Sequence, residues 1–356
     1  MSRFLSEKFR DITPYTPGEQ PKNEVYIKLN TNESPFPPSS EVKKAITGSQ
    51  IDDLRLYSDP EATSLVNAIA QNYGVNAENV LVTNGSDEAL AFAFLAFGGD
   101  KPFAFPSISY GFYKVFARLF SVKARQVPLT KNFEININDY LTNGENVCIA
   151  NPNAPTGIGV ETSKIEEILK AHKNDIVIID EAYVDFGAVS VIPLCKKYDN
   201  LLVIGTFSKS RNLAGARIGF AIADAQIIAD LNKMKFSFNP YNVNRLSMVI
   251  GTKSMEDKAY FETCTQKIID ARKTTTKELE KIGFEVLPSS ANFIFAKNDK
   301  ISGEKLFKKL KENKILVRFF NEEPIKDYLR ITIGTDKQME IFVNTVKKIL
   351  AENDNL

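Results

Sequence analysis

Two short apolar segments joined by a helical one constrain the fold more than any other feature of the chain. Asn146–Ala150 (NVCIA) and Ile176–Asp180 (IVIID) have the composition of buried strands. Parallel strands need a long crossover, usually a helix, and strands covered on both faces read as continuous apolar runs. The sequence therefore predicts a βαβ unit. We expect its helix to begin at a capping box made by Ser163 and Glu166.

The alternation of strands and helices extends to both sides of this unit. Further strands of the same sheet are expected at Asn79–Thr83, Lys101–Phe105, Lys123–Val127, Leu201–Gly205 and Ile218–Ala223, with helices at Glu61–Tyr73, Glu88–Phe97 and Gly111–Phe120. Downstream we expect a long charged helix at Met255–Lys281, strands at Phe284–Leu287, Asn292–Ala296, Ile315–Phe319 and Tyr328–Ile333, and helices at Gly303–Asn313 and Lys337–Glu352. The predicted class is α/β: a large domain with a mostly parallel sheet covered by helices, and a smaller α+β C-terminal domain.

The domain boundaries are placed where the pattern changes. Residues 1–38 are rich in proline, which prevents long helices, so they are predicted to be an arm that packs with the small domain or a partner subunit. Residues 39–250 make the predicted large domain. Residues 251–356 make the small one.

A single histidine, His172, excludes several classes of enzyme. A Ser-His-Asp triad would have to use this residue, and a site with two histidine ligands cannot form within one chain. His172 lies in the basic segment Lys170–Asn174, which reads as a frayed helix end. We expect it to be a solvated surface residue, and we expect no metal site.

Cysteine usage indicates the redox compartment of the protein, and its net charge bears on the partners that it can bind. Cys148, Cys195 and Cys264 are far apart and form no disulfide framework, which suits a reducing, cytoplasmic compartment. Cys148 is expected to be a small buried hydrophobe. The net charge of +1 gives no electrostatic case for a nucleic-acid or membrane partner.

Polar residues follow the predicted strands at their carboxyl ends, where open α/β sheets bind ligands. Gly85-Ser86-Asp87 opens a helix and could bind a phosphate, although plain N-capping explains it equally well. Asp180 ends an apolar strand, where an acid is costly unless it is paired. Lys209 follows another strand among hydroxyls and arginines, where burial and neighbouring cations would lower its pKa and free its amine for imine formation. Together these loops supply what pyridoxal phosphate needs.

Five motifs then occur in a recognisable order: GSDEA (85–89), NPNAPTG (151–157), DEAY (180–183), TFSKSRNLAGARIG (206–219) and YLRITIGT (328–335). This series resembles the fold-type I aminotransferases that depend on pyridoxal phosphate, and more narrowly the histidinol-phosphate aminotransferase family. The segments TPY (13–15), LNTNESP (29–35) and PYNVN (240–244) also resemble that family. The resemblance covers nearly the whole chain and is more specific for fold and cofactor than for substrate.

The resemblance implies a role for each matching residue. Lys209 would join the cofactor through an imine and later move a proton, Asp180 would pair with the ring nitrogen, and Tyr183 would bond to the ring hydroxyl. Tyr110 would stack on the ring, and Tyr57 would reach the phosphate of the cofactor in the partner subunit of a homodimer. The remaining phosphate ligands would be Ser86, Asp87, Thr206, Ser208 and Arg217.

The resemblance also implies a substrate pocket. Arg330 would bind the anionic end of the substrate, since a guanidinium suits both carboxylate and phosphate. Arg318 would be a second anion contact, and Tyr15, Asn32 and Tyr241 would line the pocket.

One position departs from the family pattern. Many relatives carry an asparagine that contacts the ring hydroxyl immediately before Pro-Thr-Gly, and here that residue is Ala154. The ring oxygen still needs a donor in a dry site, so Asn153 is a candidate substitute.

The expected activity is transfer of an amino group between L-histidinol phosphate and 2-oxoglutarate in histidine biosynthesis, giving imidazole acetol phosphate and L-glutamate. The alternatives on the same scaffold are an aminotransferase for aromatic amino acids or another phosphorylated amino alcohol, and, less favoured, a decarboxylase of a phosphorylated amino acid. A non-catalytic binding protein would not need Lys209.

Overall fold

A seven-stranded sheet forms the centre of the computed structural model, which describes residues 2–21 and 24–354. The strand order is β2-β8-β7-β6-β5-β3-β4. Its strands are β2 (Val80–Thr83), β3 (Phe103–Pro106), β4 (Ala124–Val127), β5 (Asn146–Ala150), β6 (Val177–Asp180), β7 (Leu201–Thr206) and β8 (Gly219–Ala223). Strand β8 is antiparallel to both neighbours, and β3 to β7 pair in parallel. Every residue of β5 to β8 is buried, which explains why these strands are apolar except at some of their ends.

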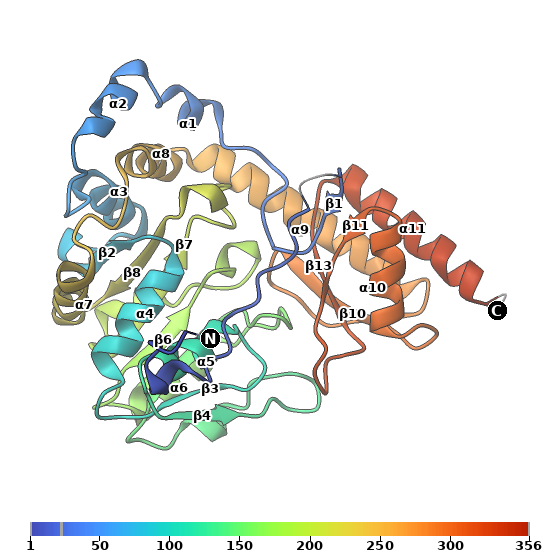
Figure 1. Ribbon diagram of the computed structural model, residues 1–356, viewed down its shortest axis with the longest axis horizontal. Helices are drawn as coiled ribbons and strands as arrows, with labels where there is room; N and C mark the ends of the chain where they lie inside the picture. Colours follow the sequence, from blue (N-terminus) through green and yellow to red (C-terminus); the bar gives the residue numbers. More distant parts are fainter. Residues whose placement is uncertain (1, 22–23, 355–356) are drawn as a thin grey trace.

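Helices cover both faces of this sheet (Figure 1). Successive residues of β5 point to opposite faces, so Ile149 belongs to the same buried cluster as Leu65, whereas Cys148 belongs to the cluster of Leu90. The first face is covered by α3 (Thr63–Tyr73), α6 (Thr162–Ala171) and α8 (Arg245–Glu256), and the second by α4 (Ser86–Phe97), α5 (Phe112–Leu119) and α7 (Ala225–Phe238). The α/β class and the burial of Cys148 are confirmed.

The C-terminal part has its own antiparallel sheet and core. The sheet has the order β12-β13-β10-β9. Its elements are β9 (Phe284–Val286), β10 (Phe293–Asn298), β12 (Arg318–Phe319) and β13 (Leu329–Thr332), with α9 (Lys258–Glu280), α10 (Gly303–Glu312) and α11 (Asp336–Asp354). The exact domain boundaries at residues 38 and 250 remain predictions.

The N-terminal segment runs between the two parts of the molecule, as the dark blue ribbon in Figure 1 shows. Its strand β1 (Ile27–Lys28) pairs in parallel with β11 (Ile315–Leu316) of the C-terminal part. Tyr15 stacks on Phe112 of α5 with ring centroids 4.5 Å apart. The arm therefore contacts both the large sheet's helices and the small domain. It is followed by the short helices α1 (Ser40–Lys44) and α2 (Gly48–Asp52), and single 3-10 turns occur at Glu7–Phe9, Asp53–Arg55, Ala77–Asn79, Ile137–Tyr140, Val184–Phe186, Ile192–Lys196 and Ala214–Ala216.

Three sequence-based expectations about local structure are wrong. The helix expected over 255–281 is interrupted at Asp257, whose carboxylate accepts from the Tyr260 amide and starts α9. The strand expected over 315–319 divides into β11 and β12, which pair with different partners. The capping box at Ser163 does not form, because the N-cap of α6 is Glu161, two residues earlier, and the helix begins at Thr162.

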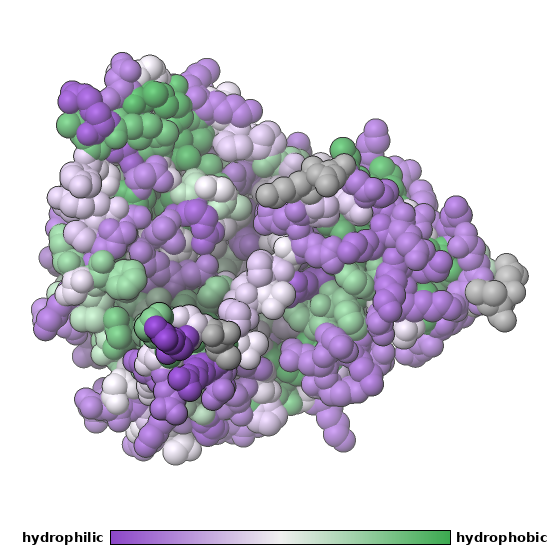
Figure 2. Space-filling view, viewed as in Figure 1, coloured by the Kyte–Doolittle hydropathy of each residue, from purple (hydrophilic) through white to green (hydrophobic). Residues whose placement is uncertain are grey.

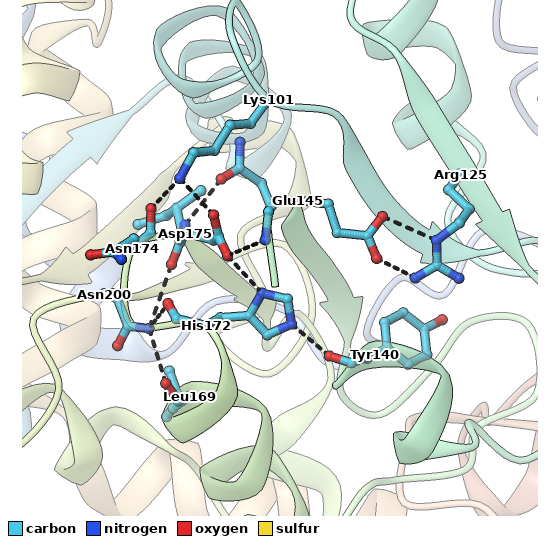
Figure 3. A network of polar contacts seen from close by, with 12 residues as sticks. Lys101, Arg125, Tyr140, Glu145, Leu169, His172, Asn174, Asp175 and Asn200 are labelled. Atoms are coloured by element: carbon cyan, nitrogen blue, oxygen red, sulfur yellow. Dashed lines mark hydrogen bonds and ion pairs between the residues drawn. The ribbon is translucent and has the colours of Figure 1, made fainter. Parts of the chain in front are cut away.

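His172 is also not the surface residue that we expected, because its side chain is 0% exposed. It ends α6 and turns inward, so that Nε2 donates to the Tyr140 carbonyl oxygen at 2.6 Å. Nδ1 lies 3.2 Å from Asp175, whose other carboxylate oxygen binds Lys101 at 2.6 Å (Figure 3). Both ring nitrogens are thus tied into a buried polar network, which makes His172 a structural residue.

Candidate active site

Lys209 lies in the loop that follows β7, with its ammonium group turned toward the arm. Its Nζ donates to the Thr31 carbonyl oxygen at 3.2 Å and lies 5.8 Å from the centre of the Tyr183 ring. Burial, together with the positive charges of Arg330 and Arg217, lowers the pKa of Lys209 to about 8. A substantial fraction of the amine is therefore neutral near pH 8 and can act as a nucleophile.

Asp180, the last residue of β6, is held by two donors. The Tyr113 hydroxyl donates to Oδ2 at 2.8 Å and the Ala182 amide to Oδ1 at 3.1 Å. Burial raises the pKa of Asp180 to about 6, against the effect of these bonds. A carboxylate held this way is suited to a cationic partner. Sequence reasoning missed Tyr113, although a tyrosine buried on α5 needs a partner for its hydroxyl.

The turn after β2 approaches β8 closely. Gly85 adopts φ +80° just before α4, and a Cβ on Gly219 would lie 2.3 Å from Gly85 C and Ser86 N. Arg217, itself at φ +52°, donates from Nη2 to Asp87 Oδ2 at 3.2 Å, and Tyr110 donates to Asp87 Oδ1 at 2.7 Å. The Asp87 side chain is thus held by Arg217 and Tyr110. The first backbone amides of α4 lie at a helix N-terminus, a position that suits an anion.

Two hydroxyls stand beside this turn on the Lys209 loop. Thr206 and Ser208 are both 7% exposed, and the Thr206 hydroxyl donates to Ser208 Oγ at 3.0 Å. The Ser208 amide donates back to Thr206 Oγ1 at 3.1 Å. The sequence predicted both as phosphate ligands, and their mutual bonds give them fixed positions.

Arg330 of β13 is partly buried, and not all of its N–H groups have a hydrogen-bond partner. Its Nη2 donates to the Asn30 carbonyl oxygen at 2.9 Å, and the guanidinium lies 5.5 Å from the Phe293 ring centre and 5.7 Å from that of Phe320. Its buried Nε has no hydrogen-bond partner among the described residues. Because buried donors are normally paired, this geometry favours an anionic ligand.

Arg318 contacts the arm. Its Nη2 donates to the Thr16 carbonyl oxygen at 3.0 Å and its Nη1 to that of Pro17 at 3.3 Å. The neighbouring Tyr15 is 39% exposed, and its ring centre lies 6.1 Å from that of Tyr110. The direct role of Arg318 at a substrate anion therefore stays a prediction, whereas its contacts to the arm are structural.

The two asparagines predicted to face the ligand make different contacts. Asn32 Nδ2 donates to the Tyr183 hydroxyl at 3.1 Å. Asn153 donates to the Ile108 carbonyl at 3.0 Å and to Thr156 Oγ1 at 3.2 Å, which engages both of its N–H groups. Asn153 could thus donate to a cofactor only by giving up one of these bonds.

Tyr57 and Tyr241 contact each other at the surface. Their rings stack with centroids 4.5 Å apart, and they are 79% and 43% exposed. Tyr57 was expected to contact the cofactor phosphate in the partner subunit, and Tyr241 was expected to line the substrate pocket. Both roles remain predictions.

Two further findings concern the described part of the chain. Over residues 2–21 and 24–354, no cluster of three or more histidine, cysteine or acidic side chains is arranged to hold a metal ion. Within the same ranges, no helix is both long and apolar enough to cross a membrane.

Comparisons with known proteins point to one family. Residues 24–346 match the family model for class I and II aminotransferases. A histidinol-phosphate aminotransferase from Brachyspira hyodysenteriae is 51% identical over 98% of this chain and 99% of its own length. The crystal structure of the histidinol-phosphate aminotransferase from Clostridium acetobutylicum matches with a TM-score of 0.84 at 26% identity, covering 93% of this chain and all of that one. The Sinorhizobium meliloti enzyme, solved in complex with pyridoxal-5'-phosphate, matches in fold with a TM-score of 0.83 at 22% identity, covering 92% of both chains.

Proposed function

Because the chain belongs to the class I and II aminotransferases, and within them to the histidinol-phosphate aminotransferase family, we propose that it transfers an amino group between L-histidinol phosphate and 2-oxoglutarate. The products are imidazole acetol phosphate and L-glutamate, and the reaction is a step of histidine biosynthesis. The structural observation that carries the proposal is Lys209, a half-buried lysine with a lowered pKa that faces Tyr183.

The cofactor of such an enzyme is pyridoxal phosphate, and the residues present fit it. The N-terminus of α4 has no side-chain cap, the Gly85–Gly219 contact leaves no room for a Cβ, and Arg330 Nε and Thr31 Oγ1 are buried without partners among the described residues. When bound, pyridoxal phosphate supplies an aldehyde that links to amines and a ring that withdraws electrons from them.

The proposed roles of the residues follow from their positions. The neutral Lys209 amine would attach to the cofactor and afterwards carry a proton, Asp180 would hold a proton on the ring nitrogen, and Tyr183 would donate to the ring oxygen. The phosphate would bind the amides of Ser86 and Asp87, together with the residues Thr206, Ser208 and Arg217, and Tyr110 would cover the ring. The buried Tyr113 would keep the Asp180 carboxylate aimed at its target.

Arg330 is proposed to bind the anionic end of either substrate. Its planar guanidinium can donate two hydrogen bonds to a carboxylate or to a phosphate, so glutamate and a phosphate ester can bind at the same place in turn. Phe293 and Phe320 flank the guanidinium, with ring centres 5.5 Å and 5.7 Å from it, and would limit its movement.

We also propose that the protein is a cytoplasmic homodimer that shares residues between active sites. Ile51, Leu54 and Tyr57 are 48%, 49% and 79% exposed, and Figure 2 shows a hydrophobic surface over α1 and α2. Contiguous exposed apolar surface of this kind is typical of an interface. Tyr57 stands in this region, where it could reach a second subunit. The three cysteines are free thiols, as suits a reducing compartment.

A panel of amine donors assayed with 2-oxoglutarate tests the substrate. Histidinol phosphate should give the highest kcat/KM for glutamate formation, ahead of phenylalanine, tyrosine and other phosphorylated amino alcohols. If the kcat/KM for phenylalanine equals that for histidinol phosphate, the proposed substrate is wrong. Release of carbon dioxide from a phosphorylated amino acid, without glutamate formation, would indicate the decarboxylase alternative.

A further inference from the structure

Three consecutive residues of the arm each contact a different functional side chain. The Asn30 carbonyl accepts from Arg330 at 2.9 Å, the Thr31 carbonyl accepts from Lys209 at 3.2 Å, and Asn32 Nδ2 donates to the Tyr183 hydroxyl at 3.1 Å. Segment 30–32 therefore joins the proposed anion-binding residue, the lysine and the phenol within one short stretch of backbone.

Asn32 is fixed more firmly than a residue that merely lines a pocket. It is 1% exposed and adopts φ +55°, a conformation that asparagine tolerates better than most residues. The backbone amide of Asn32 donates to Thr332 Oγ1 at 3.0 Å, and the Thr332 hydroxyl donates back to the side-chain oxygen of Asn32, Oδ1, at 2.9 Å. Asn292 Nδ2 donates to the Asn32 carbonyl at 3.0 Å. These bonds to the small-domain sheet fix which face of the carboxamide meets Tyr183.

Because Oδ1 is occupied by Thr332, Asn32 must present its NH₂ group to Tyr183. We propose that Asn32 is a positioning residue that sets the direction of the Tyr183 hydroxyl hydrogen. A phenol oxygen that accepts from Asn32 keeps its own hydrogen free to donate elsewhere. This inference rests on the proposed function, in which that hydrogen is donated to the ring oxygen of the cofactor. It gives Asn32 a role different from the substrate contact expected from the sequence.

Two residues near Tyr183, Ala154 and Asn153, are poorly placed to donate a hydrogen bond to the ring oxygen. Ala154 is 4% exposed and packs with Phe293 and Tyr183, but it has no polar side-chain atom. Both N–H groups of Asn153 are engaged within its own loop region. The donor strength of Tyr183, and hence its orientation by Asn32, should therefore control the ring oxygen.

The absorption band of the lysine-bound cofactor changes with pH, and the midpoint of that change reports how strongly Tyr183 donates to the ring oxygen. A donor to the ring oxygen withdraws the electron density that stabilises a proton on the neighbouring nitrogen, so weakening the donor raises the midpoint. Asn32→Asp offers Tyr183 an acceptor, which reverses the bond, and should raise the midpoint by about 0.7 pH unit, since one hydrogen bond contributes about 1 kcal/mol and one pH unit corresponds to about 1.4 kcal/mol. Asn32→Gly keeps the backbone conformation and should give a smaller rise.

A double-mutant cycle with Tyr183→Phe separates positioning from general disturbance. If Asn32 acts through the phenol, Asn32→Gly should add almost nothing to the rise in the Tyr183→Phe background. An unchanged midpoint in both Asn32 variants, or an equal shift with and without the phenol, overturns the inference. Should Asn32→Asp fail to fold, Asn32→Gly supplies the same comparison, with thermal unfolding as the check on folding. If the wild-type protein shows no such band, the proposed function itself is wrong.

Discussion

The close approach of Gly219 to the Gly85–Ser86 turn gives a quantitative test of the proposed phosphate site. Gly219 begins β8 between Thr83 and Thr206, which fixes its backbone on both sides. A methyl group there would lie 2.3 Å from Gly85 C and Ser86 N, where ordinary Cβ contacts begin at 3.4 Å. The turn must therefore retreat by about 1 Å, and such overpacking costs about 1–3 kcal/mol.

If that cost falls on the bound state, Gly219→Ala should weaken cofactor binding roughly 5- to 150-fold. The assay is a fluorescence titration of the cofactor-free protein with pyridoxal phosphate, with thermal unfolding measured in parallel. Gly215→Ala is the matched control, because a Cβ at Gly215 meets nothing within 4 Å. Unchanged affinity in Gly219→Ala, or equal weakening in both variants, would refute the placement of the phosphate at this turn.

Two further predictions concern charge and hydrogen bonding. The rate at which cofactor-free protein links to pyridoxal phosphate should rise as pH increases through about 8, because the folded pKa of Lys209 lies there and only the neutral amine reacts. Arg330→Met removes a cation that lowers this pKa, so its midpoint should move to higher pH, and a rate independent of pH from 6 to 9 would contradict the assignment. His172→Phe leaves the Tyr140 carbonyl without its donor and removes the His172 contact to Asp175 Oδ2, which the Gly144 amide still binds, so it should lower the free energy of unfolding by about 1–3 kcal/mol in urea titrations, without changing cofactor affinity. Unaltered stability would show that His172 is not part of a structural network.

The sequence predicted those parts of the fold that depend on local pattern. Strands β5 to β8 are buried along their whole length and apolar except at some of their ends, and they were placed to within a residue or so of their observed bounds. Lys209 and Asp180 were predicted because parallel strands carry their functional residues at the carboxyl ends.

Contacts between residues that are far apart in the sequence could not be predicted from it. Tyr113 meets Asp180 across 67 residues, and Lys209 meets Thr31 across 178. His172 was misplaced for the same reason, since its partner carbonyl at Tyr140 lies 32 residues away on another element. These partners are chosen by packing, for which one sequence contains no periodic signal.

Local capping was also hard to predict. Asp257 ends one helix and starts the next, although the charged pattern runs through it without a break. At α6, a Ser-x-x-Glu spacing satisfied the rule for a capping box, but the helix begins at Thr162. Short-range motifs of this kind indicate an approximate position rather than a boundary.

The measurement that most directly tests the central claim is chemical trapping at Lys209. The purified holoprotein is treated with borohydride, digested and analysed by mass spectrometry, alongside Lys209→Ala as the control. We predict one pyridoxyl adduct, on the peptide that contains Lys209, and none in the variant, which should also lose glutamate-dependent turnover. An adduct at another lysine, or its absence from a protein that still transfers amino groups, would contradict the account.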